Sequence, residues 1–313
     1  MPGTIFFIVA LHLPVLLQEV LQAFKPLKIS TFLDGTLGAG GHAEALLADH
    51  PEIELYIGAD QDPSALNIAK ERLSPWKEKL LLLHENFSSL PPILQQKGIN
   101  PDGILLDIGV SSMQLDQPER GFSFRFDAPL DMRMDTTKGQ TAAEILNTSS
   151  EKDLQRIFRE YGEEPKWRRA AAAIMKGRPI HTTFELKALL EPVLGKKRFG
   201  EKEPITQIFQ ALRIATNREL DVLQEFLPSG IELLPAGGRM GIITFHSLED
   251  RMVKETFNLK ASDKWATTGY RGHFMDKDPE VLLVNRKAIG PSDEELAVNP
   301  RCRSAKLRVI EKL

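Results

Sequence analysis

A glycine-rich segment that follows an acidic residue is the part of this chain best suited to bind a ligand. The apolar residues 31–33 predict a strand that ends at Asp34, and glycines follow at positions 35, 38, 40 and 41. Residues 43–47 then have the spacing of a helix start. A strand that passes through glycines into a helix leaves backbone N–H groups and the positive helix end free to contact a ligand. The segment therefore predicts a cofactor site.

Two classes of cofactor fit the spacing of these glycines. Asp34-x-x-x-Gly38-x-Gly40 is typical of the loop that binds S-adenosylmethionine (SAM) in methyltransferases. Gly38-x-Gly40-x-x-Ala43 also fits the dinucleotide fingerprint, with Asp60 twenty residues after Gly40, where an acid would bind a ribose. A carboxylate in the loop would repel the pyrophosphate of NAD, whereas SAM carries a positive sulfonium and an amino group. Asp34 therefore favours SAM. An NAD-dependent oxidoreductase is the alternative, and a purely structural strand-to-helix turn is a third interpretation.

Four short apolar strands, separated by helical patterns, must position this loop. They are predicted at residues 31–33, 55–59, 80–83 and 103–106. Such an alternation predicts a parallel sheet with helices on both faces, and ligands bind such sheets at the carboxyl ends of the strands. Four side chains fall at these ends, namely Asp34, Asp60, Phe87 and Asp107. Their convergence is a stronger indication of a site than any one of them.

A helical segment interrupts the alternation. Residues 113–135 predict a loop rich in charge and phenylalanine, and helices follow with capping-box starts at Thr141-x-x-Glu144 and Thr182-x-x-Glu185. The last of these helices is predicted to run without a break from Ile205 to about Leu227. Further strands are predicted at 240–245, 281–285 and 306–310. We therefore expect a seven-stranded α/β domain made of residues 1–113 and 215–313, with a helical domain inserted at 114–214.

The composition narrows the class of protein. The 313 residues are 42% hydrophobic and 27% charged, as in an ordinary soluble globular protein, and the net charge of −3 gives no overall nucleic-acid signature. The single cysteine, Cys302, excludes an intramolecular disulfide, argues against a cysteine-built metal site and suits a reducing cytoplasm. The apolar residues 5–11 are too few to cross a bilayer, so we expect an N-terminal arm or strand there.

Positive charge is concentrated locally. Residues 151–200 contain twelve Lys or Arg against seven Asp or Glu, and residues 301–313 contain five against one. A local basic surface on a net acidic chain indicates binding to an anionic polymer. The alternative is a solvated helix face whose lysines serve solubility.

Taken together, the motifs closely resemble those of the bacterial family of small-subunit ribosomal RNA methyltransferases that methylate N4 of a cytosine in 16S rRNA. The matching blocks include 12–16, 34–42, 60–63, 106–112, 120–124, 129–135, 161–164, 209–214, 245–251 and 299–301. The resemblance implies a class I SAM-dependent methyltransferase with a Rossmann-like sheet and an inserted helical substrate-recognition domain. It also implies SAM as cofactor, no metal, and the decoding region of 16S rRNA in the small ribosomal subunit as substrate. The oligomeric state stays open, a homodimer included.

The resemblance also assigns the cofactor contacts one by one. Gly40, Gly41 and His42 match the loop around the methionine part, Asp60 the acid on the ribose, and Phe87 the residue against the adenine, while Asp107 and Gln114 match further contacts. The residues themselves allow simpler roles. Phe87 could be core packing, and both His42 and His246 could be ordinary helix-start or core histidines.

The substrate side is less defined. An acceptor for the cytosine amine could be Asp107, a backbone carbonyl of residues 108–111, or Ser111, so no catalytic residue is assigned. Phe122 and Phe124 could stack on an extruded base or form one face of a strand. Candidate phosphate contacts, with surface salt bridges as the alternative, are Arg120, Arg125, Arg133, Lys196, Lys197 and Arg198. A non-catalytic RNA-binding factor in ribosome assembly is the remaining alternative function.

Overall fold

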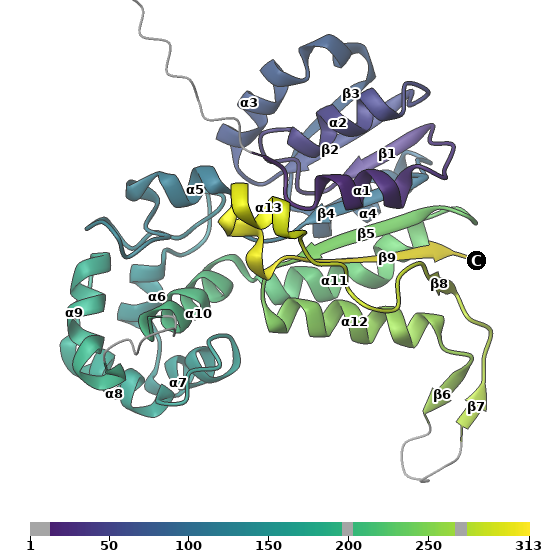
Figure 1. The fold of residues 1–313 in the computed structure, drawn as a ribbon. Helices are drawn as coiled ribbons and strands as arrows, with labels where there is room; N and C mark the ends of the chain where they lie inside the picture. The colour runs from purple at the N-terminus through teal and green to yellow at the C-terminus, as the bar shows by residue number, and fades with distance from the viewer. Residues whose placement is uncertain (1–12, 196–202, 267–273) are drawn as a thin grey trace, which may run out of the picture. The chain divides into compact units, whose positions relative to one another are not determined.

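The structure, a computed structural model, describes residues 13–195, 203–266 and 274–313 (Figure 1). It divides into two compact units. The first unit comprises Met1–Gly109 and Val222–Leu313, and the second comprises Val110–Asp221. The domain boundaries predicted at 114 and 214 lie a few residues inside the second unit. In the described parts of the chain, none of the helices has the length and apolar character that crossing a membrane requires.

The first unit is built on one seven-stranded sheet, as predicted. Its strand order is β3-β2-β1-β4-β5-β9-β8, parallel from β3 to β5 and antiparallel at β9 and β8. The strands are β1 (Thr31–Asp34), β2 (Leu55–Asp60), β3 (Leu80–His84), β4 (Gly103–Asp107), β5 (Arg239–Thr244), β8 (Val281–Leu283) and β9 (Lys306–Lys312). The sequence order reverses between β1 and β4, which are neighbours in the sheet.

Helices cover both faces of this sheet (Figure 1). Successive strand residues point to opposite faces, so Leu33 belongs to one hydrophobic cluster and Phe32 to the other. The first cluster includes residues of α4 (Leu90–Gln96), α11 (Glu219–Leu233) and α12 (Ser247–Ala261). The second includes residues of α1 (Leu17–Phe24), α2 (Gly41–Asp49) and α3 (Pro63–Arg72). Because both faces are buried, the strands are nearly continuous apolar runs in the sequence.

The second unit is helical and has its own hydrophobic core. Its helices are α5 (Ser112–Asp116), α6 (Ala142–Thr148), α7 (Glu151–Glu160), α8 (Trp167–Gly177), α9 (Thr183–Leu194) and α10 (Ile205–Asn217). The predicted capping boxes are confirmed, because Thr141 and Thr182 each accept the amide of the glutamate three residues later. The short helix α5 lies in a segment predicted to be a loop.

The prediction of one unbroken helix from Ile205 to about Leu227 is wrong. Helix α10 ends at Asn217, Arg218 adopts a left-handed conformation with φ of 52°, and α11 begins at Glu219. The Asn217 side chain donates to the carbonyl of Met132 and accepts the amide of Met134, each at 2.8 Å. Because these long-range bonds hold the break, no glycine or proline is needed there.

Several further elements were not predicted. They include α1, α12, the hairpin of β6 (Lys264–Ala266) with β7 (Phe274–Asp276), and α13 (Asp293–Val298). The apolar residues 5–11, predicted to form an arm or strand, lie outside the described residues. The strands of the hairpin and α13 are too short to show a hydrophobic periodicity.

Candidate cofactor site at the strand ends

Three carboxylates lie at the carboxyl ends of parallel strands in the first unit. Asp34 ends β1, Asp60 ends β2 and Asp107 ends β4. The register pairs β1 with β2 on one side and with β4 on the other, which brings these ends to one edge of the sheet. The edge lies where the strand order reverses, the place at which open α/β sheets bind ligands.

Two of these carboxylates fix the glycine loop. Asp60 Oδ2 accepts the amide of Gly38 at 2.8 Å, and Asp34 Oδ1 accepts the amide of Thr36 at 3.1 Å. Gly40, at the start of α2, has a left-handed φ of 78°, which residues with a side chain rarely adopt. A Cβ on Gly41 would lie 2.6 Å from Cγ of Pro14. The loop thus needs glycines for its own conformation and packing as well as for any ligand.

His42 connects the loop to Asp107. Its Nε2 lies 2.9 Å from the carbonyl oxygen of Val15, so Nε2 carries the proton and donates, because a carbonyl can only accept. Its Nδ1 lies 3.8 Å from Asp107 Oδ2. His42 is buried in the first turn of α2, as the helix-start interpretation predicts. Pro14 and Val15, which belong to the matching block 12–16, therefore help to fix the position of the glycine loop.

The three carboxylates have raised pKa values. Burial, opposed by hydrogen bonds from Thr36 and Tyr56, raises the pKa of Asp34 to about 7. Burial raises the pKa of Asp60 to about 6. For Asp107, burial and then the charges of Asp34 and Glu249 raise the pKa to about 8. Buried carboxylates whose ionised form is disfavoured in this way would be stabilised by a cationic ligand.

Asp107 also has an unused acceptor. Its Oδ1 is buried and has no hydrogen-bond partner in the part of the chain that the structure describes. Its backbone amide donates to Thr36 Oγ1 at 2.6 Å, which fixes the residue against the loop. A buried carboxylate oxygen without a donor calls for an explanation, and a ligand N–H group would supply the missing donor.

The side chains of Phe87 and Gln114 each contact residues of the unit to which they belong. The Phe87 ring packs edge-on against Phe226, with centroids 5.4 Å apart, and only 7% of the residue is exposed, so the core-packing interpretation holds. Gln114 belongs to the second unit, where its side chain accepts the amide of Ser111 at 3.1 Å in a capping box. The contacts of Phe87 and Gln114 with SAM remain predictions.

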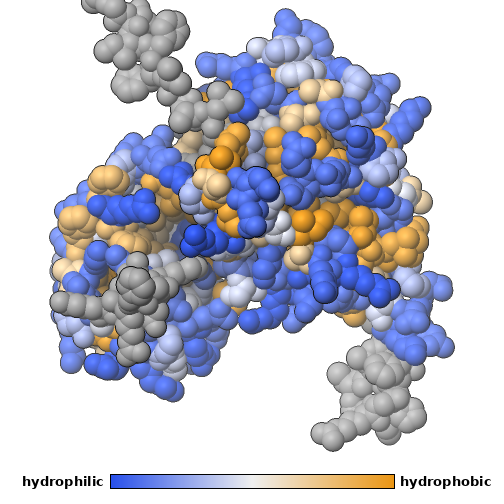
Figure 2. Space-filling view, in the orientation of Figure 1, coloured by the Kyte–Doolittle hydropathy of each residue, from blue (hydrophilic) through white to orange (hydrophobic). Residues whose placement is uncertain are grey.

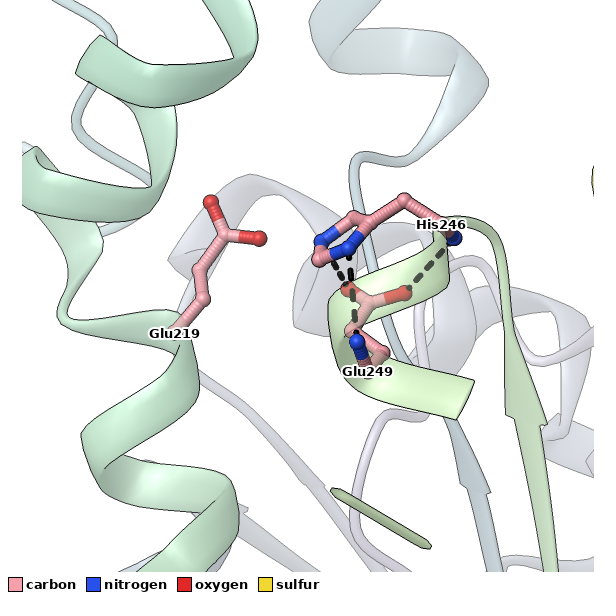
Figure 3. Close-up of side chains that lie close together, drawn as sticks. All are labelled: Glu219, His246 and Glu249. Carbon is pink, nitrogen blue, oxygen red and sulfur yellow. Dashed lines mark hydrogen bonds and ion pairs between the residues drawn. The ribbon is translucent and has the colours of Figure 1, made fainter. Parts of the chain in front are cut away.

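A histidine–glutamate pair follows β5 (Figure 3). Glu249 Oε2 accepts the backbone amides of Phe245 and His246 at 2.8 and 3.2 Å, and Oε1 lies 2.9 Å from His246 Nε2. His246 is thus a helix-start histidine, one of the alternatives that the sequence allowed. The His-x-x-Glu spacing is that of a capping box and could have revealed the pair. It places a buried carboxylate at the end of the strand beside β4.

The two phenylalanines proposed for base stacking, both in the second unit, differ in how far their rings are exposed. Phe122 is 8% exposed and belongs to the core, so its ring has almost no free face for a base. Phe124 is half-buried and packs edge-on against Phe209 at 5.2 Å. Neither lies in a strand, so that alternative is wrong for both.

The candidate phosphate contacts fall into two groups, those already bound to other residues and those still available. Arg133 makes a two-point ion pair with Asp131 at 2.8 Å, and Arg120 donates to the carbonyls of Arg133 and Met134, so both arginines serve local structure. Arg125 is exposed and is the free candidate in this loop. The cluster of Lys196, Lys197 and Arg198 lies outside the described residues.

The sheet order, the glycine loop after β1 and the acids that end β1, β2 and β4 together define a class I SAM-dependent methyltransferase. The chain belongs to the MraW methylase family, whose sequence profile matches residues 9–313. This membership confirms the prediction of SAM, and the NAD-dependent oxidoreductase is excluded.

Curated relatives match over nearly their whole length. A protein of Protochlamydia amoebophila (strain UWE25) is 56% identical over 307 residues, covering 96% of this chain and 97% of the relative. Relatives from Geobacter sp. (strain M21) and Heliobacterium modesticaldum (strain ATCC 51547 / Ice1) are 46% and 43% identical, each covering 96% of this chain and 98% of the relative. All three are named Ribosomal RNA small subunit methyltransferase H.

Proposed function

We propose that this enzyme uses SAM to methylate N4 of a cytosine in the decoding region of 16S rRNA. The observation that carries the RNA substrate is the similarity, over 96% of the chain, to a relative named Ribosomal RNA small subunit methyltransferase H. The cytosine and its N4 atom follow from the motif resemblance. The excess of basic residues at 151–200 supports a polyanionic substrate. An rRNA substrate also agrees with the cytoplasmic location that we expect.

The proposed cofactor contacts combine the glycine backbone with acidic, aromatic and amide side chains. They are Gly40, Gly41, His42, Asp60, Phe87, Asp107 and Gln114. SAM supplies a methyl group on a positively charged sulfur. Burial, and for Asp107 also the charges of Asp34 and Glu249, disfavours the ionised forms of Asp34, Asp60 and Asp107, so a ligand with a positive charge would stabilise those forms.

Asp107 is our candidate for the group that activates the cytosine amine. The amine is a poor nucleophile because its lone pair is delocalised into the ring. A carboxylate that accepts a hydrogen bond from the amine localises the lone pair as the N–C bond forms and the S–C bond breaks. The surplus proton then passes from N4 to Asp107 and on to solvent. The unpartnered Oδ1 of Asp107 supports this role.

The other acceptors considered are less suitable. Ser111 Oγ already accepts the amide of Gln114 at 3.2 Å as the cap of α5. The backbone carbonyls of residues 108–111 can orient an amine, but they cannot take up its proton at neutral pH. Among these candidate acceptors, only Asp107 has a pKa near neutrality.

Nucleoside mass spectrometry tests the proposal. Small subunits from a strain that lacks the enzyme should gain N4-methylcytidine on incubation with the protein and SAM. A methyl group on another atom or nucleotide would contradict the proposed site. No methylation at all, with RNA binding intact, would instead support a non-catalytic assembly factor. Calorimetry should show binding of SAM and none of NADH.

The second unit is our candidate for the substrate-recognition domain. Replacing Lys196, Lys197 and Arg198 together by alanine should weaken RNA binding and leave the affinity for SAM unchanged, because these side chains would contact phosphates only. An equal loss of both affinities, or a loss of neither, would contradict this division of roles.

A further inference from the structure

A pocket of about 660 Å³ lies wholly within the second unit. Its lining includes two phenylalanine rings, Phe124 and Phe184, together with Arg125 and Lys187. Figure 2 shows hydrophobic surface on the part of this unit where α9 lies. The volume falls in the range of sites for small organic ligands, and it suffices for one nucleotide.

The two aromatic rings have different environments. Phe184, in the first turn of α9, is 45% exposed, so part of its ring is free to pack on a ligand. Phe124 is supported by Phe209 on one edge and by Lys187, whose Nζ lies 5.3 Å from the ring centroid. The exposed ring of Phe184, next to the fixed ring of Phe124, provides an aromatic surface on which a planar base can stack.

The charged groups are arranged for a nucleotide as well. Arg125 is exposed and forms no ion pair with any residue that the structure describes, so its guanidinium is free to bind a phosphate. Lys187 lies 3.4 Å from Glu203, an ion pair that solvent screens. Glu191 and Glu203 can accept hydrogen bonds from the exocyclic amine of a base.

We propose that this pocket holds an unpaired nucleotide of the RNA substrate other than the methylated one, with its base on Phe184 and its phosphate at Arg125. The proposal rests on the proposed function, since it takes RNA as the substrate. The carboxylates favour cytosine, adenine or guanine over uracil, which has no exocyclic amine. A hydrophobic peptide would leave these carboxylates and Arg125 without partners, so the lining favours a nucleotide.

The location of the pocket indicates that this nucleotide contributes to RNA binding and not to the methyl-transfer step. The described residues that line the pocket all belong to the second unit, whereas Asp107 and the glycine loop belong to the first. We therefore expect a change in the pocket to alter the KM for RNA and to leave kcat nearly unchanged.

Substitutions of Phe184 test the pocket. Phe184→Ala should raise the KM for small subunits about five- to hundredfold, the usual effect of losing one base stack, with kcat and the Kd for SAM within twofold of wild type. Phe184→Trp keeps an aromatic face and should retain a low KM. Phe126→Ala is the matched control, since Phe126 is 55% exposed in the loop of Phe124 and Arg125 but is not among the residues that line the pocket.

Tryptophan fluorescence of the Phe184→Trp variant provides a readout that does not depend on methylation. Naked 16S rRNA should quench its emission more than that of wild type, because a stacked base quenches indole. This quenching would support the pocket even if the methylated position were assigned incorrectly. Absence of methylation by wild type would contradict the proposed function alone.

Four results would overturn the proposal. In the first, Phe184→Ala behaves like Phe126→Ala, and in the second it lowers kcat at unchanged KM. In the third, only assembled subunits quench the Phe184→Trp variant, which indicates a ribosomal protein as the occupant. In the fourth, Phe184→Ala changes the sedimentation of the free enzyme, which indicates a second copy of the chain.

Discussion

The acids at the strand ends of the first unit and those at positions 131 and 135 of the second unit differ in how their charges are compensated. In the first unit, burial and neighbouring acids raise the pKa of Asp107 to about 8. In the second unit, Asp131 is also partly buried, but the hydrogen bonds and charge of Arg133 outweigh that burial and lower its pKa. Asp135 behaves in the same way, with Thr137 and Lys138 as partners. A carboxylate with a cationic partner serves structure, whereas one left among other acids is available to a ligand.

The largest effect is expected for Asp107→Asn. The rate of methyl transfer should fall at least about a hundredfold, because the amide cannot take up a proton and has no charge for the sulfonium. The SAM-free protein should be at least as stable as wild type at pH 8, since a repelling buried charge is removed. Initial rates and thermal unfolding check these two outcomes. A rate within tenfold of wild type would exclude Asp107 as the activating group.

The pH dependence of SAM binding is the second test. The folded-state pKa values of Asp60, Asp34 and Asp107 are about 6, 7 and 8, all above the ordinary value of 3.8 for an aspartate. Their contribution to stability is therefore complete below about pH 4 and is lost as pH rises through 6 to 8. A cation favours their ionised forms, so SAM affinity should rise over the same range and binding should release protons.

Two measurements check this pH dependence. Thermal unfolding between pH 5 and 9 should show that SAM stabilises the protein most at high pH. Calorimetry at pH 7 in two buffers of different ionisation enthalpy should show proton release. An affinity that does not vary between pH 6 and 8 would mean that these carboxylates do not respond to the ligand.

Asp131→Asn tests the second unit in the opposite sense. Loss of the two-point pair with Arg133 should lower the free energy of unfolding by about 1–2 kcal/mol, with SAM affinity unchanged. The stability from Asp131 is present above the unfolded pKa near 4 and is lost as pH falls below it. The variant should therefore lose less stability than wild type on acidification. A weaker affinity for SAM would break the proposed contrast between the units.

The smallest effect is expected for Glu249→Gln. Its charge raises the pKa of Asp107, so the substitution should lower the pH midpoint of SAM binding, by less than about one unit. Glu255→Gln, an exposed change on the same helix, is the control and should leave the midpoint in place. Equal midpoints in the two variants would show that Glu249 does not influence Asp107.

Local patterns explain how much of the fold could be predicted. The strands of the sheet and the caps at Thr141 and Thr182 depend on neighbouring residues, so the sequence reveals them. The break at Arg218 depends on bonds from Asn217 to Met132 and Met134, more than eighty residues away, and no short-range pattern reports it.

The candidate site likewise combines features that local sequence patterns reveal with features that depend on tertiary contacts. The positions of Asp34, Asp60 and Asp107 follow from where strands end. The bond between His42 and the Val15 carbonyl and the packing of Phe87 on Phe226 come from tertiary contacts instead. Chemistry-bearing residue types could thus be located from the sequence, but whether a ring is free or buried, or an arginine paired, could not.

The place of β9 has a consequence for how the chain is made. Residues 306–312 pair with β5 on one side and with β8 on the other, although the ribosome adds them long after the 110–221 unit is complete. At roughly 5–20 residues per second, the nascent helical unit has several seconds in which to fold before β9 emerges. Meanwhile the edge of β5 that β9 will cover stays unpaired, and an unpaired strand edge can pair with another chain.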